Sequence, residues 1–574
     1  MNDSKEEFLG ELRLGRKLTT AGQTAAGGVA ILLGLLFLVT QPLLTLSNAF
    51  APLAGLLAII LIGMTLASVI ELLGGSSERG GTYTLVEGTI GGLISFLTGW
   101  SILAGSLVLV AALLRTIANR LLTMIPLGNL SPEILALLIF IPLTLIQLFQ
   151  LFPKQVRLRT LVFPLIGLLL IAVLTMLPQV DLGVFRFAAP VPLSAINQSV
   201  GLLGVSYAAF EALLISRRQI YDPGRHLPDA IIRTLLIGGA IFISTWFVIA
   251  GLNITTPPVG DLIVKNLYNS GIFPYPVLDV LALIALLLAA NGSMMVAARQ
   301  IHAFSLEGAF PQIFRRIVGP FLMPIALFAF LAGLVISLII LAPITWLVNL
   351  GSTMFLISML VTNLTAIYSH RAEPERRRPF VVPFSPLVPG LAAAIIILLI
   401  GGMPGRTLLS ALSWSIVGVV VYLAYARFHQ VEAQEGEVVF GQVQIEEAGE
   451  ARFRILLPIE KGEERYLTLQ VAAALARQLN GEIIPLQVIT VPDPLAIEEG
   501  RRIAQERNML FRRSISLIGD VGTPVHPFTR LARTASEGII DTAVETNCNL
   551  ILMSWNVQQT GPGARIGPTL SQVT

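Results

Sequence analysis

Apolar and polar residues divide the chain into two parts. Between Ala26 and Ala426, apolar runs of about 20 residues follow one another, separated by polar segments. A helix of about 20 apolar residues spans the hydrocarbon core of a bilayer. The pattern therefore predicts about twelve membrane-spanning helices, at 26–46, 51–73, 91–114, 132–152, 160–178, 195–215, 231–252, 276–298, 321–342, 344–367, 386–402 and 407–426.

Beyond Arg427 the pattern is that of a domain surrounded by water. We predict strands at the short apolar runs 454–459, 482–491, 514–519 and 550–555. Between them lie three helical patterns: one that ends at 480, one at about 496–510 and one near 533–546. Strands that alternate with helices favour a doubly wound parallel sheet. We expect a cytoplasmic segment at 1–25, an all-α membrane domain at 26–427, a linker at 428–451 and an α/β domain at 452–574.

The charges agree with a membrane protein and indicate its orientation. Only 13% of the 574 residues are charged, against roughly 25% in soluble domains. When the segments between spans are sorted alternately, one set holds 19 lysines and arginines and the other holds five, Arg115, Arg120, Arg186, Lys265 and Arg406. An excess of basic residues marks the cytoplasmic side. We expect a multi-pass protein of the inner membrane with both termini in the cytoplasm and no nucleic-acid partner.

Two further features concern processing and redox state. The N-terminal segment MNDSKEEFLGELRLGRK is too long and too acidic for the start of a signal peptide, so the first span is expected to stay in the protein. The single cysteine, Cys548, excludes an internal disulfide and fits a reducing compartment.

Several motifs resemble those of the amino acid–polyamine–organocation permeases. The most specific are Gly80-Gly81-x-Tyr83 after the second span, Phe210-Glu211 with Asp222-Pro223 downstream, and Arg378-Pro379-Phe380-x-x-Pro383. The resemblance covers roughly residues 10–430, and the tail from Arg454 resembles a universal stress protein domain. The permease resemblance implies a membrane domain of two five-helix inverted repeats plus two further helices.

The resemblance also implies a substrate site. In that family the first and sixth helices are broken at mid-membrane, where free backbone groups hold the substrate's charged groups. The matching candidates here are Leu33, Gly34 and Leu35 in the first span, and Tyr207, Ala208, Ala209 and Phe210 in the sixth. The first-span stretch departs from the family pattern because it keeps a single glycine. Either the break moves toward Gly27-Gly28 or Gln41-Pro42, or the helix is continuous and the usual carboxylate site is lost.

Glu211 is an acidic residue within an apolar span. A charge at the bilayer centre costs on the order of 3 kcal/mol or more. The resemblance implies a gating or proton-sensing carboxylate, and the alternative is a neutral carboxyl that hydrogen-bonds a neighbouring helix. Asn291 and Ser293 in the eighth span are weak candidates for an ion site, since a serine in a helix more often bonds its own backbone. The coupling ion stays open.

The tail matches a nucleotide-binding stress-protein domain poorly. Glu460 stands where the family has an aspartate, and of the glycines in the family's phosphate loop only Gly563 remains. Such loops cradle phosphate with backbone N–H groups that glycine exposes. Nucleotide binding through Glu460 and Gly563 is a weak expectation. A regulatory or dimerising module is the alternative.

Two functions remain open. The first is secondary active transport of amino acids or related amines by alternating access, with a regulatory tail. The second is a ligand sensor that does not transport and signals through the tail. An enzyme is not indicated, because no P-loop, Cys/His cluster or nucleophile elbow is present in the sequence. We expect no cofactor and no metal; the expected partners are a small-molecule substrate, the lipid bilayer and a tail-mediated homodimer.

Overall fold

The computed structural model describes residues 20–73, 81–125, 130–149, 158–185, 193–217, 220, 223–252, 275–306, 308–314, 324–372, 380–429, 438–440, 453–459, 465–490, 524–532 and 535–553. The chain divides into two compact units, Met1–Gln430 and Val431–Thr574.

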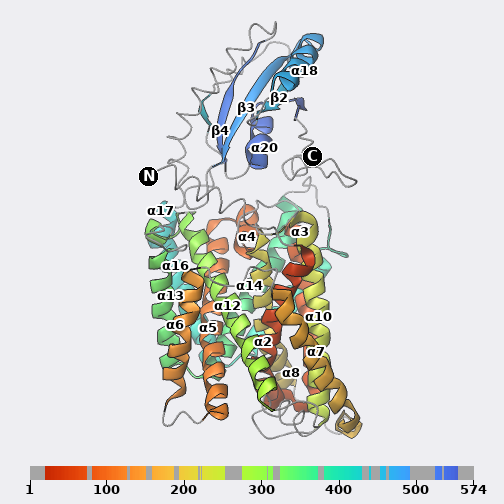
Figure 1. Cartoon of the computed structure of the whole chain (residues 1–574), viewed down its shortest axis with the longest axis vertical. Helices are drawn as coiled ribbons and strands as arrows, with labels where there is room; N and C mark the ends of the chain where they lie inside the picture. The colour runs from red at the N-terminus through yellow and green to blue at the C-terminus, as the bar shows by residue number, and fades with distance from the viewer. Residues whose placement is uncertain are drawn as a thin grey trace. The chain divides into compact units, whose positions relative to one another are not determined.

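The first unit is a bundle of helices (Figure 1). Its long elements are α2 (Ala21–Ser47), α3 (Ala51–Leu73), α5 (Gly92–Met124), α6 (Pro132–Leu148), α7 (Leu158–Met176), α8 (Leu193–Leu202), α10 (Pro223–Gly251), α12 (Tyr275–Leu306), α13 (Ile325–Leu341), α14 (Ile344–Ala372), α15 (Leu387–Gly401) and α16 (Gly405–Val421). Each predicted span overlaps one of these helices. Within the described residues, seven stretches are long and apolar enough to cross a membrane, with α2 and α3 counted as one stretch. The prediction of a polytopic all-α membrane domain is confirmed.

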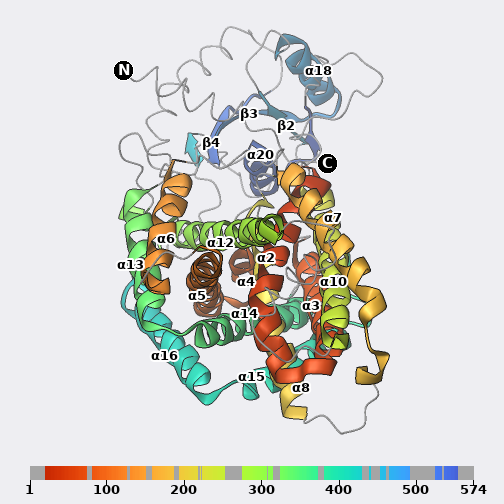
Figure 2. The ribbon, with the colours of Figure 1, turned by 60° about the horizontal axis from the view of Figure 1, so that its bottom comes forward.

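Helix α5 forms the centre of this bundle. In Figure 2 it lies inside the ring of helices, between α12 and α14, and its side chains from Trp100 to Leu114 are buried. An apolar helix that is covered on all sides is typical of a buried central element. Trp100 also ties α5 to α16, because its indole N–H donates to the Trp414 carbonyl at 2.8 Å and the Trp414 N–H donates back to the Trp100 carbonyl at 3.1 Å.

Several helices extend beyond their predicted ends, α5 and α10 among them. Helix α5 continues past 114 to Met124 because its two arginines are paired with acids rather than exposed: Arg115 with Glu133 and Arg120 with Asp279. Helix α10 begins at Pro223 rather than at 231. Proline suits the first position of a helix, where its fixed φ angle is already helical and its missing N–H is not needed.

The second unit contains a five-stranded sheet in the order β1-β4-β3-β2-β5. Strands β2 (Arg454–Pro458), β3 (Glu482–Thr490), β4 (Phe528–Ala532) and β5 (Leu550–Ile551) are parallel, whereas β1 (Val438–Phe440) pairs antiparallel with β4. The predicted parallel sheet is confirmed. Strand β4 was not predicted from the sequence, and β1 lies within the segment predicted as a linker. The helix expected at 496–510 and the strand expected at 514–519 lie outside the described residues.

Helices cover both faces of this sheet. Ile455 and Leu457 of β2 pack with alanines of α18 (Arg465–Gln478), while Leu456 between them packs with Ile539 of α20 (Ala535–Glu545). This alternation follows from the strand geometry, in which successive side chains point to opposite faces. The buried Arg530 of β4 pairs with Glu545 of α20 at 2.6 Å, so a charge within this strand is neutralised by the covering helix.

Candidate functional site at the sixth span

The sixth span is not a regular α-helix. Helix α8 ends at Leu202, a 3-10 helix, η5, runs from Leu203 to Tyr207, and α9 (Ala208–Leu214) completes the span. A 3-10 stretch inside a helix often marks a hinge. The Ser352 hydroxyl of α14 donates to the Leu202 carbonyl at 2.6 Å, which satisfies a backbone group at the junction. The interruption therefore lies where the resemblance implies a break, and the chain there stays helical.

The Glu211 side chain lies at the N-terminus of a short helix, α4 (Thr82–Ile90). It is buried, and the Thr82 hydroxyl donates to Oε1 at 2.5 Å while the Thr82 amide lies 3.5 Å from Oε2. Thr82 is the first residue of α4, whose N-terminal N–H groups have no partner within the helix. A carboxylate is stabilised at this position because the end of the helix carries partial positive charge.

Gly81 explains why these groups can approach so closely. A Cβ atom at this position would lie 3.1 Å from Oε2 of Glu211, tighter than ordinary van der Waals contact. The structure thus brings two of the specific motifs together, the glycine pair after the second span and the Phe210-Glu211 pair of the sixth. Glycine at 81 leaves room for the carboxylate.

Further hydroxyl groups surround the Glu211 carboxyl. The side chains of Tyr207 and Ser358 lie close to Glu211, and Thr362 lies close to Tyr207. The hydroxyls of Tyr207 and Ser358 are buried and make no hydrogen bond of standard geometry within the described part of the chain. The carboxyl therefore has polar neighbours from α4, η5 and α14. No ion pair of Glu211 with a basic side chain occurs among the described residues.

The other end of α9 is held by arginine. Arg299 of α12 donates to the Ile215 carbonyl at 3.1 Å and to the Ser216 hydroxyl at 3.2 Å. Arg217 lies close to the end of α3, with Nη2 at 3.4 Å from the Leu73 carbonyl oxygen. Basic groups at a helix C-terminus complement its partial negative charge. Helix α9 is thus anchored by Thr82 near its start and by Arg299 at its end.

The first span is a continuous helix. Helix α2 runs unbroken from Ala21 to Ser47, with Pro42 inside it, which decides between the alternatives left open by the sequence. Leu33, Gly34 and Leu35 are buried. A Cβ atom at Gly34 would overlap the Ala285 carbonyl and the Ala289 side chain of α12. Gly34 therefore permits close packing of α2 on α12 and does not mark a break.

The remaining candidates of the sixth and eighth spans occupy different places. Tyr207, Ala208, Ala209 and Phe210 are buried at the η5–α9 junction next to Glu211. Asn291 accepts a hydrogen bond from Gln147 of α6 on its Oδ1 at 2.7 Å. The Ser293 hydroxyl is buried and unbonded within the described residues. Residues two apart on a helix do not face each other, so the structure does not bring Asn291 and Ser293 together.

Sequence reasoning missed the buried pair of Arg120 with Asp279 in the membrane unit. Nε and Nη2 of Arg120 both lie 2.9 Å from Oδ1 of Asp279, and the Phe37 ring of α2 covers the guanidinium with 5.6 Å between Cζ and the ring centroid. The sequence pattern places Arg120 in a segment between spans. The signal available in the sequence was Asp279, an isolated acid near the start of an apolar run.

The matches to known families agree with this geometry. Residues 23–422 match the amino acid permease family, and residues 452–574 match the universal stress protein family. The first match covers more than half of the chain. This chain belongs to the amino acid permease family. The resemblance noted from the motifs is confirmed for both parts of the permease.

Relatives with assigned functions are transporters. The methylthioribose transporter of Bacillus subtilis (strain 168) is 24% identical over 383 residues, covering 61% of this permease and 80% of that protein. The branched-chain amino acid permease BcaP of the same organism is 22% identical over 455 residues, covering 73% and 95%. The BcaP of Lactococcus lactis subsp. cremoris (strain MG1363) is 23% identical over 246 residues, covering 40% and 51%. These similarities indicate a membrane transporter rather than an enzyme.

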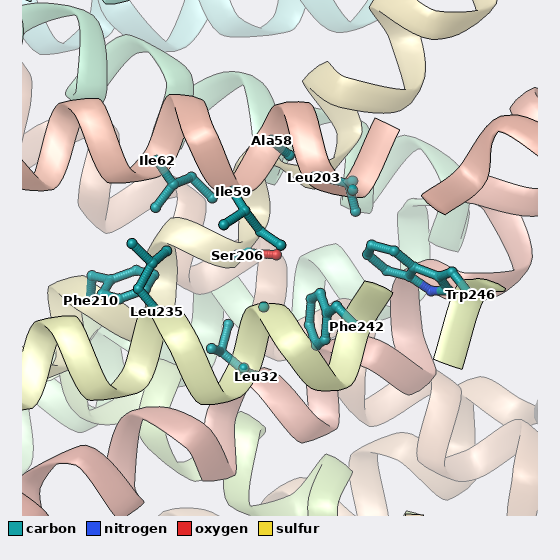
Figure 3. A pocket seen from close by; sticks show the side chains of 13 residues that line it. Leu32, Ala58, Ile59, Ile62, Leu203, Ser206, Phe210, Leu235, Phe242 and Trp246 are labelled. Atoms are coloured by element: carbon teal, nitrogen blue, oxygen red, sulfur yellow. The ribbon is translucent and has the colours of Figure 1, made fainter. Parts of the chain in front are cut away.

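An apolar pocket of the permease adjoins the sixth span. Figure 3 shows side chains of α3, α10 and η5 around it, with the Ser206 hydroxyl among them. The Trp246 indole at one end donates to the Thr40 hydroxyl at 3.0 Å. A cavity of about 20 Å³ holds roughly one water molecule. It is too small for an amino acid, so it is not a substrate cavity in this conformation.

The nucleotide candidates of the tail cannot be placed. Glu460 and Gly563 both lie outside the described residues. The described part of the tail shows a polar cluster at the start of β2 and β3 instead, where Arg454 donates to Glu482 at 2.5 Å and to the Thr546 carbonyl at 2.9 Å. The nucleotide expectation stays a prediction.

Proposed function

We propose that this permease carries amino acids or related amines across the membrane by alternating access, with Glu211 as a gate. Family membership supports the transport class. Two of the named relatives are branched-chain amino acid permeases, which supports an amino acid as the solute. The observation on which the gate rests is the contact of the Glu211 carboxylate with the N-terminus of α4.

A gating role for Glu211 follows from its place on α9, which would move with any rearrangement of η5. Rearrangement at η5 would displace α9, and Glu211 is in the first turn of α9. Its carboxylate would then leave the Thr82 hydroxyl and amide, and both would have to find other partners. Leaving a buried polar group without a partner costs about 1–3 kcal/mol. That cost makes the closed contact stable and lets protonation or a solute bias it.

We assign a regulatory role to the tail as part of this proposal. The tail has the parallel sheet and two-sided helix cover of its family and its own buried cores. A separate domain with its own core can fold and respond to a signal independently of the membrane unit. A homodimer formed through the tail is part of this hypothesis.

The second candidate is a sensor that binds a solute without carrying it. One observation favours it: α2 is continuous, and Gly34 is closed on α12. A transporter whose first helix supplies no free backbone groups lacks half of the usual solute site. In the transport proposal, side chains and the sixth span must provide the missing contacts.

Uptake into proteoliposomes tests the choice. The purified full chain would be reconstituted and offered radiolabelled leucine, isoleucine, valine, putrescine and methylthioribose, with empty liposomes as the control. Accumulation of an amino acid or amine above the control supports transport. Binding of one of them, seen as a raised melting temperature, without accumulation over the same range supports the sensor. Accumulation of methylthioribose alone contradicts the proposed solute class.

A further inference from the structure

The Arg120–Asp279 pair has an unusual geometry. Arginine and a carboxylate commonly form two parallel hydrogen bonds that use both oxygens. Here Nε and Nη2 of Arg120 both approach Oδ1 of Asp279, at 2.9 Å each. The other oxygen, Oδ2, has no hydrogen-bond partner within the described residues. The Asp279 side chain is 1% exposed and that of Arg120 is 8% exposed. A buried oxygen is thus left without a donor, although a charged group lies beside it.

Such an oxygen is costly unless something binds it. An unsatisfied buried acceptor destabilises the folded chain by about 1–3 kcal/mol, and by more when it is charged. Replacing a buried ion pair by apolar residues is often neutral or stabilising. Stability alone therefore gives no reason for this pair to exist, whereas polar and ionisable groups within membrane spans commonly line the path of a solute or an ion.

The surroundings suit a positively charged donor. The face of an aromatic ring attracts cations, and the Phe37 ring already lies over the Arg120 guanidinium, so its face adds to the attraction for positive charge around the pair. Phe37 lies on α2, about one turn beyond Gly34. Arg120 compensates the negative charge of Asp279, so the carboxylate can stay ionised and act as an acceptor. An ammonium group carries three N–H donors and fits a single free oxygen.

We propose that Asp279 binds the ammonium group of the carried solute through Oδ2, beside the Arg120 guanidinium and the Phe37 ring that covers it. This inference rests on the proposed transport function and deepens it, because it names the residue that recognises the positively charged nitrogen shared by amino acids and amines. The Arg120 guanidinium holds the carboxylate in place through Oδ1. Asp279 lies near the start of α12 and Arg120 near the end of α5, the bundle end predicted to face away from the cytoplasm, where an incoming solute would arrive first.

The first experiment compares three probes on the wild-type full chain. They are L-leucine, 3-methylbutan-1-amine, which lacks the carboxylate, and 4-methylpentanoate, which lacks the ammonium. Melting temperatures in detergent report binding, and proteoliposomes report uptake. We expect leucine and the amine to bind and 4-methylpentanoate to bind at least ~10-fold more weakly, the size expected for losing a hydrogen bond to a charged group. Equal binding of 4-methylpentanoate overturns the proposal, and this comparison needs no variant.

The second experiment removes the pair. In Arg120→Met with Asp279→Leu, both charges are replaced by side chains of similar size, so folding is expected to persist. The matched control is Arg115→Met with Glu133→Leu, which removes the other acid–base pair of α5. We expect the dissociation constant of leucine to rise at least ~10-fold in the first double variant and to stay near the wild-type value in the control.

The outcomes separate the two claims. If both double variants bind leucine like the wild type, or if both lose it equally, the Asp279 site is refuted while transport stands. If the wild type accumulates methylthioribose and neither leucine nor the amine, the site is refuted as well. If the wild type accumulates none of these solutes, the proposed transport function itself fails.

Discussion

The Thr82 hydroxyl donates a hydrogen bond of 2.5 Å to Oε1 of Glu211, although 129 positions separate the two residues along the chain. One belongs to the first turn of α4 and the other to the first turn of α9. The bond therefore connects the segment after the second span with the segment that follows the 3-10 interruption of the sixth. A rearrangement of either segment must break or move it.

Substituting the acid tests whether the bond is a gate. Glu211→Gln keeps the size of the side chain and an oxygen that can accept from Thr82, so folding should be nearly unchanged. It removes the titrating group, so the pH dependence of leucine uptake should flatten between about pH 5 and 8, the range over which the solute itself keeps its charge. The measurement is the initial uptake rate against pH for both chains in proteoliposomes. Superimposable profiles with equal rates would leave Glu211 a structural hydrogen-bonder.

Removing the donor tests the strength of the contact. Thr82→Val deletes the hydroxyl and keeps the shape, so the carboxylate loses its shortest bond and the variant should be destabilised by about 1–3 kcal/mol. Thr98→Val is the matched control, because within the described part of the chain the Thr98 hydroxyl bonds only the Ile94 carbonyl of its own helix. Thermal unfolding in detergent compares the two. Equal shifts in both variants would mean that the Thr82–Glu211 bond contributes nothing special.

Replacing glycine by alanine is expected to change the stability of the chain in opposite directions at Gly34, which packs against α12, and at Gly333, which has open space around it. Gly34→Ala places a methyl group against the Ala285 carbonyl and should destabilise the chain by about 1–3 kcal/mol through overpacking. Gly333→Ala on α13 meets nothing within 4 Å, so the better helix propensity of alanine should leave stability equal or raise it by up to about 1 kcal/mol. Melting temperatures of the two variants check this. A neutral Gly34→Ala would mean that α2 and α12 lie further apart than described.

Much of the fold followed from the sequence, for a physical reason. Bilayer thickness fixes the length of an apolar run, so every predicted span overlaps a helix. The end of α5 could not be predicted, because Arg115 and Arg120 resemble residues between spans until their partners Glu133 and Asp279 are in view. Strand β4 was missed for the same reason: Arg530 interrupts a short apolar run, and its partner Glu545 lies on α20.

The candidate site was predictable only in part. Motif resemblance pointed to Glu211 and to the glycines before Tyr83, and the structure places Gly81 against the carboxylate. The spacing of the motifs could not show that contact, because the residues lie on different elements. The first-span question was open for a different reason: one remaining glycine is compatible with a break or with close packing, and only the position of Ala285 decides between them.

The single thiol offers a probe of the tail. Cys548 is half-buried beside the Thr546 hydroxyl, and burial raises the pKa of this thiol above its usual value. Since the thiolate is the reactive form, a raised pKa lowers the reactive fraction at pH 8. The reaction with a disulfide reagent should be slower in the folded chain than after denaturation, and its rate should still increase above pH 9. A folded rate equal to the denatured rate at pH 8 would contradict this environment for Cys548.

Deleting the tail tests the independence of the two units. The buried apolar cluster of the membrane unit contains residues from Val29 to Ala426, and the clusters of the tail contain residues from Phe453 to Met553, with no residue in common. Deleting 431–574 should therefore leave a monodisperse core with a melting temperature close to that of the full chain.

Deleting only 450–574 is the matched comparison, because it keeps the apolar strand β1 while removing its partner β4. An unpaired apolar strand promotes association between chains, so the longer fragment should aggregate more in size-exclusion chromatography. If the shorter core also aggregates or fails to insert, the tail is required for the fold of the membrane unit.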